Sequence, residues 1–372
     1  MIGFSRRRFI GTAAFTAACA TLPARAGLHD RLYLNAYGSA EGFGVAGFDA
    51  DGAIRYSFAL PQRGHSFARH PHGSAVIAFA RRPGSYALVF DPRDGRLLER
   101  IAAADDRNFC GHGAFSADGR LLFATEVIAS EGEGVLGIYD TADGWRRVGE
   151  WKTHGLDPHE IRLMPGGDML VVANGGILMR SDMPRLKLNI PDMAPSLVYL
   201  DARDGRLVAR IAPPQDLRQL SIRHIAIDRR GRVAIAMQYE GPVEDAVPLV
   251  ALHDGPGGVR ELRFLPLAET ERQALRQYCG SAAMDAGGRY LAVSSPRGNR
   301  VLVWDLDDDR LPQVARLDLP DVCGIAATAA ADGFVLSSGI SRRVQWQDGQ
   351  TKELPAADRR LQWDNHMLAL PA

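Results

Sequence analysis

Short apolar runs recur along the chain from about residue 30 onward, and turns of the Asp-Gly type separate them. In one representative unit, the stretch Gly64–Gly73 leads into an apolar run, Ala75–Ala80, which is followed by Leu88–Asp91 and Arg96–Ile101. Such a unit predicts four short antiparallel strands. Because it repeats with a period of about forty residues, the pattern is typical of the blades of a β-propeller.

The number of repeats predicts the size of the ring. Six complete units begin near residues 65, 110, 158, 222, 279 and 322, whereas residues 31–60 supply only three strands and the chain end, Asn365–Leu370, supplies one. We therefore expect a single all-β domain, residues 27–372, that forms a seven-bladed β-propeller ring closed by the C-terminal strand pairing into the first blade. Closure removes the exposed sheet edges. Helical periodicity is confined to Leu267–Tyr278, where we expect one short helix between blades.

The N-terminal residues carry the pattern of an export signal. The arginines Arg6–Arg8 precede a short apolar run, Gly11–Leu22, and small residues surround a cleavage position after Ala26. This pattern predicts a twin-arginine signal peptide, residues 1–26, and a periplasmic protein. The apolar run is too short to span a bilayer, so we expect no membrane span. A retained membrane anchor and lipid attachment at Cys19 are the alternatives.

Composition excludes several classes of protein. The 372 residues are 46% apolar and 24% charged, which excludes disordered and collagen-like chains. The signal peptide holds four arginines and no acidic residue, so its removal from a chain with 44 basic and 44 acidic residues leaves 40 against 44, a net charge of −4. The chain therefore lacks the excess of positive charge that would indicate nucleic-acid binding. We expect a monomer that binds no nucleic acid.

Sequence motifs also narrow the choice of cofactor. The chain contains no Cys-x-x-Cys-His sequence, which excludes covalently attached haem. The segment Gly42–Gly47 matches the spelling of a dinucleotide-binding motif, but it leads into a strand and no helix follows, so we expect no bound nucleotide. Twin-arginine export usually carries proteins that fold or load a cofactor before they cross the membrane, which favours a bound metal or cofactor.

Histidines and cysteines recur at one position of the repeat. In a propeller the first strand of each blade lines the central channel, so residues at the starts of these strands converge on one mouth of that channel. Thiols and imidazoles are ligands of copper, zinc and iron. We therefore predict a metal or redox site at the channel mouth, with the candidate ligands His65, Cys110, His112, His159, His224, Cys279, Cys323 and His366.

Other interpretations of this position stay open. The cysteines could be small packing residues beside Gly111, Gly280 and Gly324, while the histidines bond neighbouring loops. An organic ligand is a further alternative. Only Cys279 and Cys323 lie in neighbouring blades, so they are the one candidate disulfide. Without Cys19 of the predicted signal peptide three cysteines remain, an odd number that leaves at least one free thiol.

The loops between second and third strands are expected to open on the same face as the channel mouth. Three of them are enlarged, Glu126–Glu133, Asn174–Pro195 and Gln238–Pro248. Enlarged loops on one face of a rigid scaffold often carry binding sites. Candidate cofactor-binding residues at this rim are Arg223, Glu126, Asn174, Gln238 and Glu240. The alternative is that they are solvated loop residues that close the channel mouth.

Several segments carry a resemblance to a known family. They are Asn108–Gly113, Pro158–Pro165, Val172–Gly176, Met193–Tyr199, Ser221–His224, Ala236–Gly241 and Ser294–Gly298. With the WD-repeat or YVTN-like pattern, the chain resembles an uncharacterised exported propeller family of proteobacteria, often encoded beside imelysin-type iron-regulated proteins and a di-haem protein. The resemblance implies a propeller fold, an iron-linked periplasmic setting and an imelysin-like or di-haem partner, but no reaction. The segment Ile177–Asp182 departs from the more polar, histidine-containing stretch that this family leads us to expect.

Two functional hypotheses follow. The first is a non-enzymatic periplasmic propeller that binds a metal ion or a metal-handling protein at the channel mouth, in iron acquisition. The second is an oxidoreductase or hydrolase that uses the same funnel, with His159 or His224 as acid or base and Arg223 holding an anionic substrate. The sequence shows no nucleophile pair that would favour the second hypothesis.

Overall fold

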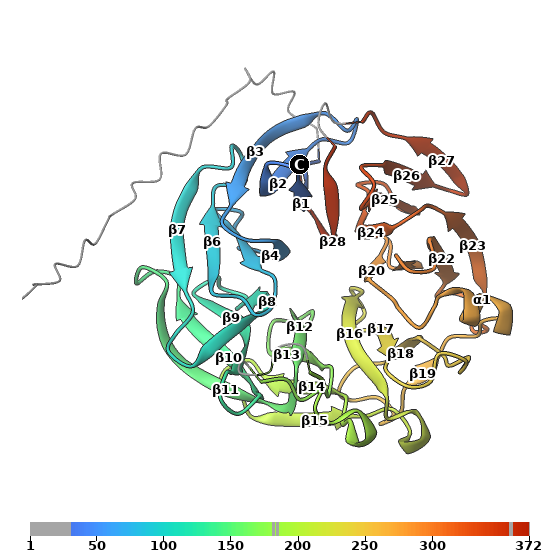
Figure 1. The fold of residues 1–372 in the computed structure, drawn as a ribbon, viewed down its shortest axis with the longest axis horizontal. Coiled ribbons are helices and arrows are strands. Elements are labelled where there is room, and N and C mark those ends of the chain that lie inside the picture. The colour runs from blue at the N-terminus through green and yellow to red at the C-terminus, as the bar shows by residue number, and fades with distance from the viewer. Residues whose placement is uncertain (1–30, 181–182, 184–185, 357–359, 372) are drawn as a thin grey trace, which may run out of the picture.

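Seven four-stranded antiparallel sheets are arranged as blades around a central axis (Figure 1). The computed structural model describes residues 31–180, 183, 186–356 and 360–371. The expected seven-bladed β-propeller is confirmed. The predicted export signal, including Cys19, lies outside the described residues. Within the described ranges, no helix is both long and apolar enough to cross a membrane.

The first blade combines strands from both ends of the chain. Its outer strands are β1 (Tyr33–Ser39), β2 (Gly42–Phe48) and β3 (Ile54–Leu60), and its innermost strand is β28 (Gln362–Ala369). Strand β28 runs antiparallel to β1, with Tyr33 opposite Ala369. The predicted closure of the ring by the C-terminal strand is therefore confirmed.

The other six blades each consist of four consecutive strands that run outward from the axis in chain order. The second blade contains β4 (Gly64–Arg69), β5 (Val76–Ala80), β6 (Tyr86–Phe90) and β7 (Leu97–Ala102). The third blade contains β8 (Arg107–Phe115), β9 (Leu121–Ile128), β10 (Glu133–Asp140) and β11 (Arg146–Leu156). The fourth blade contains β12 (Pro158–Leu163), β13 (Met169–Asn174), β14 (Ser196–Asp201) and β15 (Leu207–Ile211). The fifth blade contains β16 (Leu220–Ile227), β17 (Val233–Tyr239), β18 (Val250–His253) and β19 (Arg263–Phe264). The sixth blade contains β20 (Ser281–Met284), β21 (Tyr290–Ser295), β22 (Arg300–Asp305) and β23 (Gln313–Asp318). The seventh blade contains β24 (Val322–Ala327), β25 (Gly333–Ser338), β26 (Arg343–Gln347) and β27 (Gln350–Glu353).

One short α-helix, α1 (Glu269–Ala274), lies between the fifth and sixth blades, as the helical periodicity predicted. Leu275, directly after it, is buried, and Glu271 forms an ion pair with Arg300 at 2.8 Å. Two single turns of 3-10 helix, Ile190–Asp192 and Gln215–Leu217, lie in connecting loops. Helical structure in the described chain is thus confined to connections.

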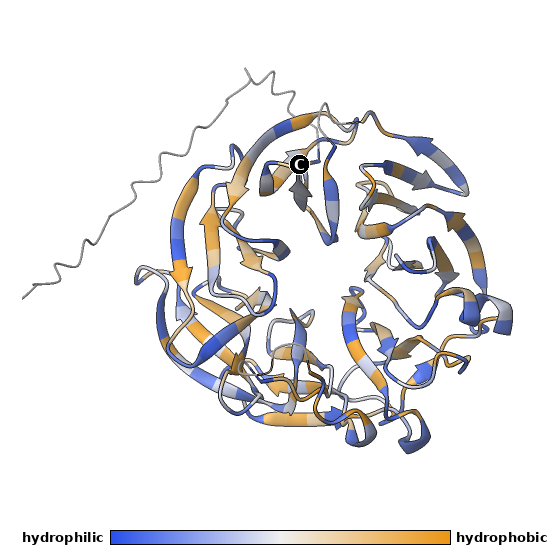
Figure 2. Ribbon diagram, in the orientation of Figure 1, coloured by the Kyte–Doolittle hydropathy of each residue, from blue (hydrophilic) through white to orange (hydrophobic). Residues whose placement is uncertain are grey.

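Apolar packing lies between neighbouring blades. The middle strands are buried on both faces, so β5 and β14 are buried along their whole length, whereas outer strands such as β3 and β11 alternate between partly buried and exposed residues. Figure 2 shows hydrophilic and hydrophobic residues interspersed along the outer strands. One apolar cluster joins three successive blades and contains Tyr199, Ile235, Val293 and Trp304. Because such clusters hold the blades together, the residues nearest the axis are free to be polar.

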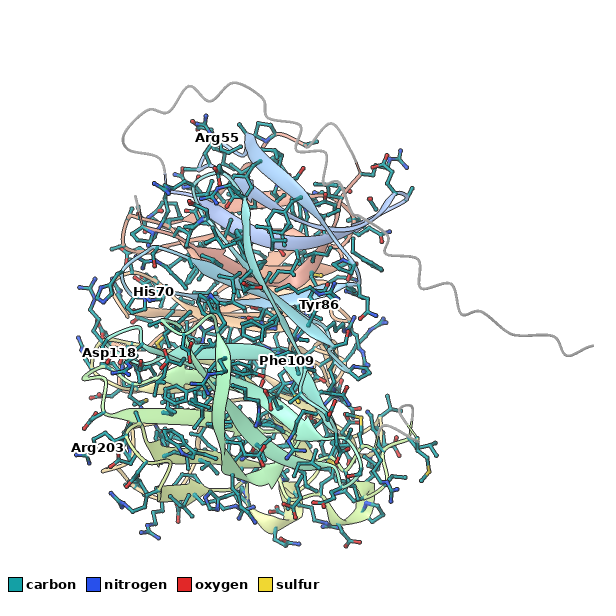
Figure 3. The ribbon with its side chains drawn as sticks, turned by 90° about the vertical axis from the view of Figure 1, so that its left-hand side faces the viewer. Arg55, His70, Tyr86, Phe109, Asp118 and Arg203 are labelled. Carbon is teal, nitrogen blue, oxygen red and sulfur yellow. The ribbon has the colours of Figure 1, made fainter. Side chains whose placement is uncertain are left out.

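The two faces of the ring differ in the loops that they carry. Turns between first and second strands and between third and fourth strands lie on one face, where Figure 3 shows His70, Asp118 and Arg203. Loops between second and third strands, and the connections from one blade to the next, lie on the other face, toward which Tyr86 is placed. The second face carries the enlarged loops.

Candidate functional site

Five imidazoles meet near the axis of the ring, each from the inner strand of a different blade. They are His65 on β4, His112 on β8, His159 on β12, His224 on β16 and His366 on β28. The His112 and His366 rings have centroids 4.5 Å apart, and the centroids of His65 and His366 are 4.6 Å apart. The rings form an almost continuous layer across the channel, which we call the histidine layer.

Irregular strand pairing places these side chains. In each of the five inner strands the register of the antiparallel pairing shifts at the histidine or at its neighbour, as between Phe109 and Gly113 around His112. A bulge of this kind leaves residues outside the ladder and changes the direction of their side chains. It therefore allows consecutive residues, such as Arg223 and His224, to reach the same space.

The ring nitrogens lie close enough together to share an ion. Two overlapping sets of four residues each offer ligand atoms that all lie within 4.8 Å of one another. The sets are His65, His112, His159 and His366, and His112, Glu160, His224 and His366. His112 and His366 belong to both. The predicted convergence of histidines from separate blades is thus present in the structure.

Several nitrogens of the histidine layer lack hydrogen-bond partners, and burial keeps two of its rings neutral. The Nε2 atoms of His112, His224 and His366 have no hydrogen-bond partner among the described residues. Burial holds the pKa of His112 and of His366 well below the ordinary value, so both rings are uncharged at neutral pH. A neutral imidazole presents a lone pair, which is the form that binds metal ions.

His159 differs from the other four rings. The Arg223 guanidinium donates to His159 Nδ1 at 3.3 Å, and arginine can only donate. The neutral His159 ring therefore carries its proton on Nε2, which leaves that atom without a lone pair for a metal. The His159 side chain is also slightly more exposed than those of His65, His112, His224 and His366, which are buried.

Two buried carboxylates stand behind the histidine layer. Asp364 Oδ1 lies 3.5 Å from His65 Nδ1, and Arg63 Nε donates to Asp364 Oδ2 at 2.5 Å. Burial alone would raise the pKa of Asp364, but His65 and Arg63 outweigh it and lower that pKa to about 2. A carboxylate beside one ring nitrogen orients the imidazole and makes its other nitrogen a better ligand.

Glu160 holds the equivalent place beside His224. Its Oε2 atom lies 3.4 Å from His224 Nδ1 and accepts the backbone N–H of Ile225, while Arg162 Nε donates to Oε1 at 2.8 Å. Although burial opposes it, Arg162 and His224 hold the pKa of Glu160 below its usual range. The sequence interpretation overlooked Glu160 because simple alternation turns it away from His159. The bulge at Pro158 removes that alternation.

The structure does not bring the cysteines into the histidine layer. Cys110 lines the funnel above the layer, Cys279 packs in the apolar cluster between blades, and Cys323 lines a separate depression beside Arg63. All three are free thiols, so Cys279 and Cys323 are not bonded. Burial raises the pKa of Cys110 and of Cys279 to about 12, which keeps these thiols protonated. They contribute no ligand to either set of four.

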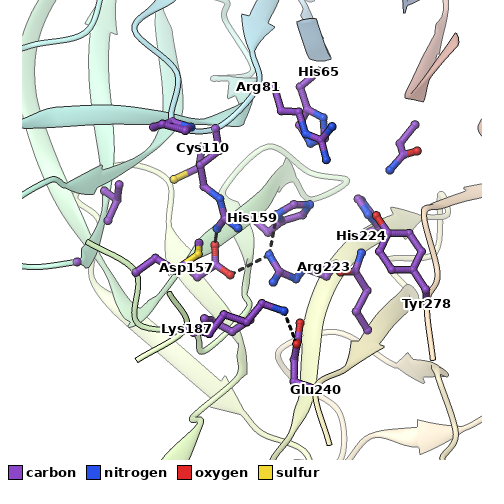
Figure 4. A pocket seen from close by; sticks show the side chains of 18 of the residues that line it. His65, Arg81, Cys110, Asp157, His159, Lys187, Arg223, His224, Glu240 and Tyr278 are labelled. Carbon is purple, nitrogen blue, oxygen red and sulfur yellow. Dashed lines mark hydrogen bonds and ion pairs between the residues drawn. The ribbon is translucent and has the colours of Figure 1, made fainter. Parts of the chain in front are cut away.

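A funnel opens above the histidine layer on the face with the enlarged loops. Its cavity of about 450 Å³ is lined by His65, His159 and His224 and by residues from all three enlarged loops, among them Gly132 and Lys187. Figure 4 shows these histidines together with Cys110, Arg223 and Glu240 around the cavity. The three enlarged loops thus border one cavity, which agrees with the expectation that they open on the same face as the channel mouth.

The predicted rim residues divide into two groups. Arg223, Gln238 and Glu240 line the funnel. Gln238 Nε2 donates to the Cys279 carbonyl at 3.2 Å, and Glu240 forms an ion pair with Lys187 that joins two of the loops. These three predicted residues are therefore at the funnel, as expected.

Glu126 and Asn174 are not at the rim, which corrects the sequence interpretation. Both lie near the ends of middle strands and point into the blades rather than into the funnel. Glu126 is buried, where it accepts from the Tyr139 hydroxyl at 2.5 Å and from Arg147 at 2.8 Å. Asn174 is buried as well and donates to the Thr153 carbonyl at 3.0 Å. The position of each residue along its strand decides whether its side chain points into the blade or into the funnel.

A buried ion-pair network forms one wall of the funnel. Asp157 pairs with Arg82 and also with Arg223, whose Nη1 lies 2.8 Å from Asp157 Oδ2. Burial lowers the pKa of Arg82 to about 9, and it also lowers that of Arg223. Two guanidinium groups thus share a single carboxylate. Neither Asp157 nor Arg82 was singled out from the sequence, because neither stands in the repeated position.

Comparison with known proteins bears on the fold and the family. No curated protein matches the chain. Among solved structures, hydrazine synthase from Kuenenia stuttgartiensis matches 84% of this chain and 90% of its own at 17% identity, with a TM-score of 0.61. At that identity the likeness concerns the fold alone. The profile of the family described as "Protein of unknown function (DUF1513)" matches residues 58–370. The expected membership of an uncharacterised family is confirmed, and the chain belongs to the DUF1513 family.

Proposed function

We propose that the protein binds one transition-metal ion, of copper, zinc or iron, in the histidine layer. The observation that carries the proposal is the set of imidazoles from different blades whose buried nitrogens lack partners and lie within reach of a common point. A buried polar atom without a hydrogen bond costs about 1–3 kcal/mol. Coordination of an ion would satisfy several such atoms at once.

His65, His112 and His366 are the ligands that the geometry favours. His112 and His366 belong to both candidate sets, and His65 is backed by Asp364. In the other set, Glu160 already accepts from Arg162 and from the backbone of Ile225, so its oxygens are less available. Three imidazoles are a common protein contribution to zinc, copper and iron sites, and they leave a coordination position for water or a further ligand.

The wider setting is part of the same proposal. A non-enzymatic role in periplasmic iron acquisition, with an imelysin-like or di-haem protein as partner, is supported by the export-type N-terminal sequence and by the family resemblance. The funnel supports it further, because its enlarged loops offer a surface on which a metal-handling partner could dock beside the ion.

Metal titration of the full exported chain tests the proposal. Chelator-treated protein is titrated with Cu²⁺, Zn²⁺ and Fe²⁺ (the last without oxygen), and metal content is measured after gel filtration. We expect one ion per chain at micromolar or lower concentration, and at least about 100-fold weaker binding in His112→Ala. His72→Ala removes an exposed histidine of the opposite face and serves as the control. Equal binding by the two variants, or no binding by the native chain, would contradict the proposal.

A further inference from the structure

The funnel has a second chemical character, which is an excess of positive charge. Its lining contains six basic side chains, Arg81, Arg82, Arg180, Lys187, Arg223 and Arg297, against two carboxylates, Asp157 and Glu240. The whole chain, by contrast, has equal numbers of basic and acidic residues. The charge is therefore concentrated at this cavity rather than spread over the surface.

The excess of positive charge in the funnel comes from its arginines. Lys187 and Glu240 pair with each other, so they contribute little net charge. Among the described residues, Asp157 is the one carboxylate that forms ion pairs with Arg82 and Arg223. The Arg223 side chain is only 5% exposed, and its Nε has no hydrogen-bond partner among the described residues. A buried guanidinium that is only partly compensated is unfavourable unless an anion approaches it.

Two further arginines stand at the funnel mouth. Arg81 and Arg297 are exposed, and neither forms an ion pair with a carboxylate in the described part of the chain. The Arg297 guanidinium lies 4.4 Å from the centroid of the Tyr278 ring, which also lines the cavity. This contact holds the charge against the funnel wall. Cations thus stand at the mouth of the funnel and in its wall.

We propose that the funnel binds a small organic or inorganic oxyanion, of the carboxylate or phosphate class, directly above the histidine layer. Planar guanidinium groups recognise these oxyanions through paired hydrogen bonds. A cavity of about 450 Å³ accommodates a molecule with several such groups. The inference gives a ligand class to the site of the proposed metal ion, but it does not require the metal to be bound.

Calorimetric titration of the metal-free exported chain tests this inference. Citrate represents the polycarboxylates and inorganic phosphate represents the phosphates. We expect at least one to bind with a dissociation constant below about 1 mM at low salt, and the stronger of the two identifies the source of the oxyanion. If neither anion binds with a dissociation constant below about 1 mM, the inference is overturned.

Variants connect the binding to the arginines. Arg223→Gln is expected to weaken binding at least about tenfold, and Arg297→Gln about threefold to tenfold. Arg260→Gln removes an exposed arginine that does not line the funnel and should leave binding unchanged. Asp157→Asn removes a competing carboxylate and should tighten binding. Because Arg297 is exposed, its substitution is informative even if Arg223→Gln does not fold. Equal affinities in the native chain, Arg297→Gln and Arg260→Gln would overturn the inference.

The outcome separates this inference from the proposed metal site. Loss of anion binding with intact metal binding would remove the oxyanion site alone. Anion binding by a chain that takes up no copper, zinc or iron would leave the oxyanion site standing and remove the metal centre.

Discussion

The imidazole of His65 lies against the backbone of Gly111 in the neighbouring blade. A Cβ atom at residue 111 would stand 2.5 Å from His65 Cδ2, closer than side-chain atoms approach. Gly111 also has a φ of +101°, which L side chains rarely adopt. The position of His65 therefore depends on the absence of a side chain at residue 111.

Replacement of Gly111 by alanine is expected to displace His65 and strain β8. We expect Gly111→Ala to lower the free energy of unfolding by about 1–3 kcal/mol and to weaken metal binding at least about tenfold. Urea unfolding and metal competition measure the two effects. Gly144 also has a positive φ, +56°, but nothing surrounds its missing Cβ within 4 Å. Gly144→Ala should therefore lose stability and keep its metal affinity, and a loss of affinity there would contradict the explanation.

The two candidate ligand sets can be told apart by single substitutions. Because His65 belongs to the favoured set, His65→Ala should weaken metal binding by at least about 100-fold, whereas His224→Ala should weaken it by less than about tenfold. Competition with a chromophoric chelator gives both affinities. The reverse order would assign the ion to the set that contains Glu160.

Asp364 is expected to act through His65 as a positioning residue. Asp364→Asn keeps the size of the side chain but removes the charge beside His65 Nδ1, so metal affinity should fall about 10-fold to 100-fold. A double-mutant cycle with His65→Ala checks the mechanism. If Asp364→Asn reduces affinity equally when His65 is absent, the carboxylate does not act through that ring.

Removal of the last strand is expected to open the ring. Deletion of residues 362–372 takes away β28 and exposes the paired edge of β1, so the chain should lose its cooperative thermal transition and self-associate. Circular dichroism and light scattering measure these changes. Deletion of residues 371–372 alone leaves β28 complete and should change neither. A stable monomer without β28 would show that closure is not required.

Glu150 provides a pH-dependent contribution to stability. It accepts from Arg107 at 2.9 Å and from Arg147 at 2.7 Å, and these partners lower its pKa from 4.5 to about 2. A depressed carboxyl pKa stabilises the folded state above the unfolded value, and that contribution is lost as the pH falls from about 4.5 to about 2. The side chain is 33% exposed, so solvent screens the pairs.

Glu150→Gln should therefore lower the free energy of unfolding by about 1 kcal/mol at pH 7, with a smaller difference at pH 3. Urea unfolding at the two pH values measures the effect. A difference that stays constant between pH 7 and pH 3 would show that ionisation of Glu150 does not contribute.

The repeat pattern was sufficient to predict the blades, because in six of the seven blades the four strands follow one another in the chain, and the strands left over at the two ends make up the first blade. It also predicted the five histidines, since they share one place in that repeat. The pattern wrongly placed Glu126 and Asn174 at the funnel rim, because a shift of one residue along a strand decides whether a side chain points into the funnel or into the blade.

The partners of the histidines could not be found in the same way. The ion pair of Arg63 with Asp364 joins residues 301 positions apart, and Asp157 meets Arg223 from another blade. Such pairings depend on ring closure and leave no local pattern. Glu160 was visible beside His159, but only the bulge shows that both face the centre.

Strand β28 contributes both His366 and Asp364 as well as the last inner edge of the first blade. Synthesis proceeds from the N-terminus, so every other blade exists before these two side chains do. The histidine layer consequently cannot assemble on a nascent or C-terminally truncated chain. A metal ion in the histidine layer would therefore be bound only after β28 has been synthesised and has closed the ring.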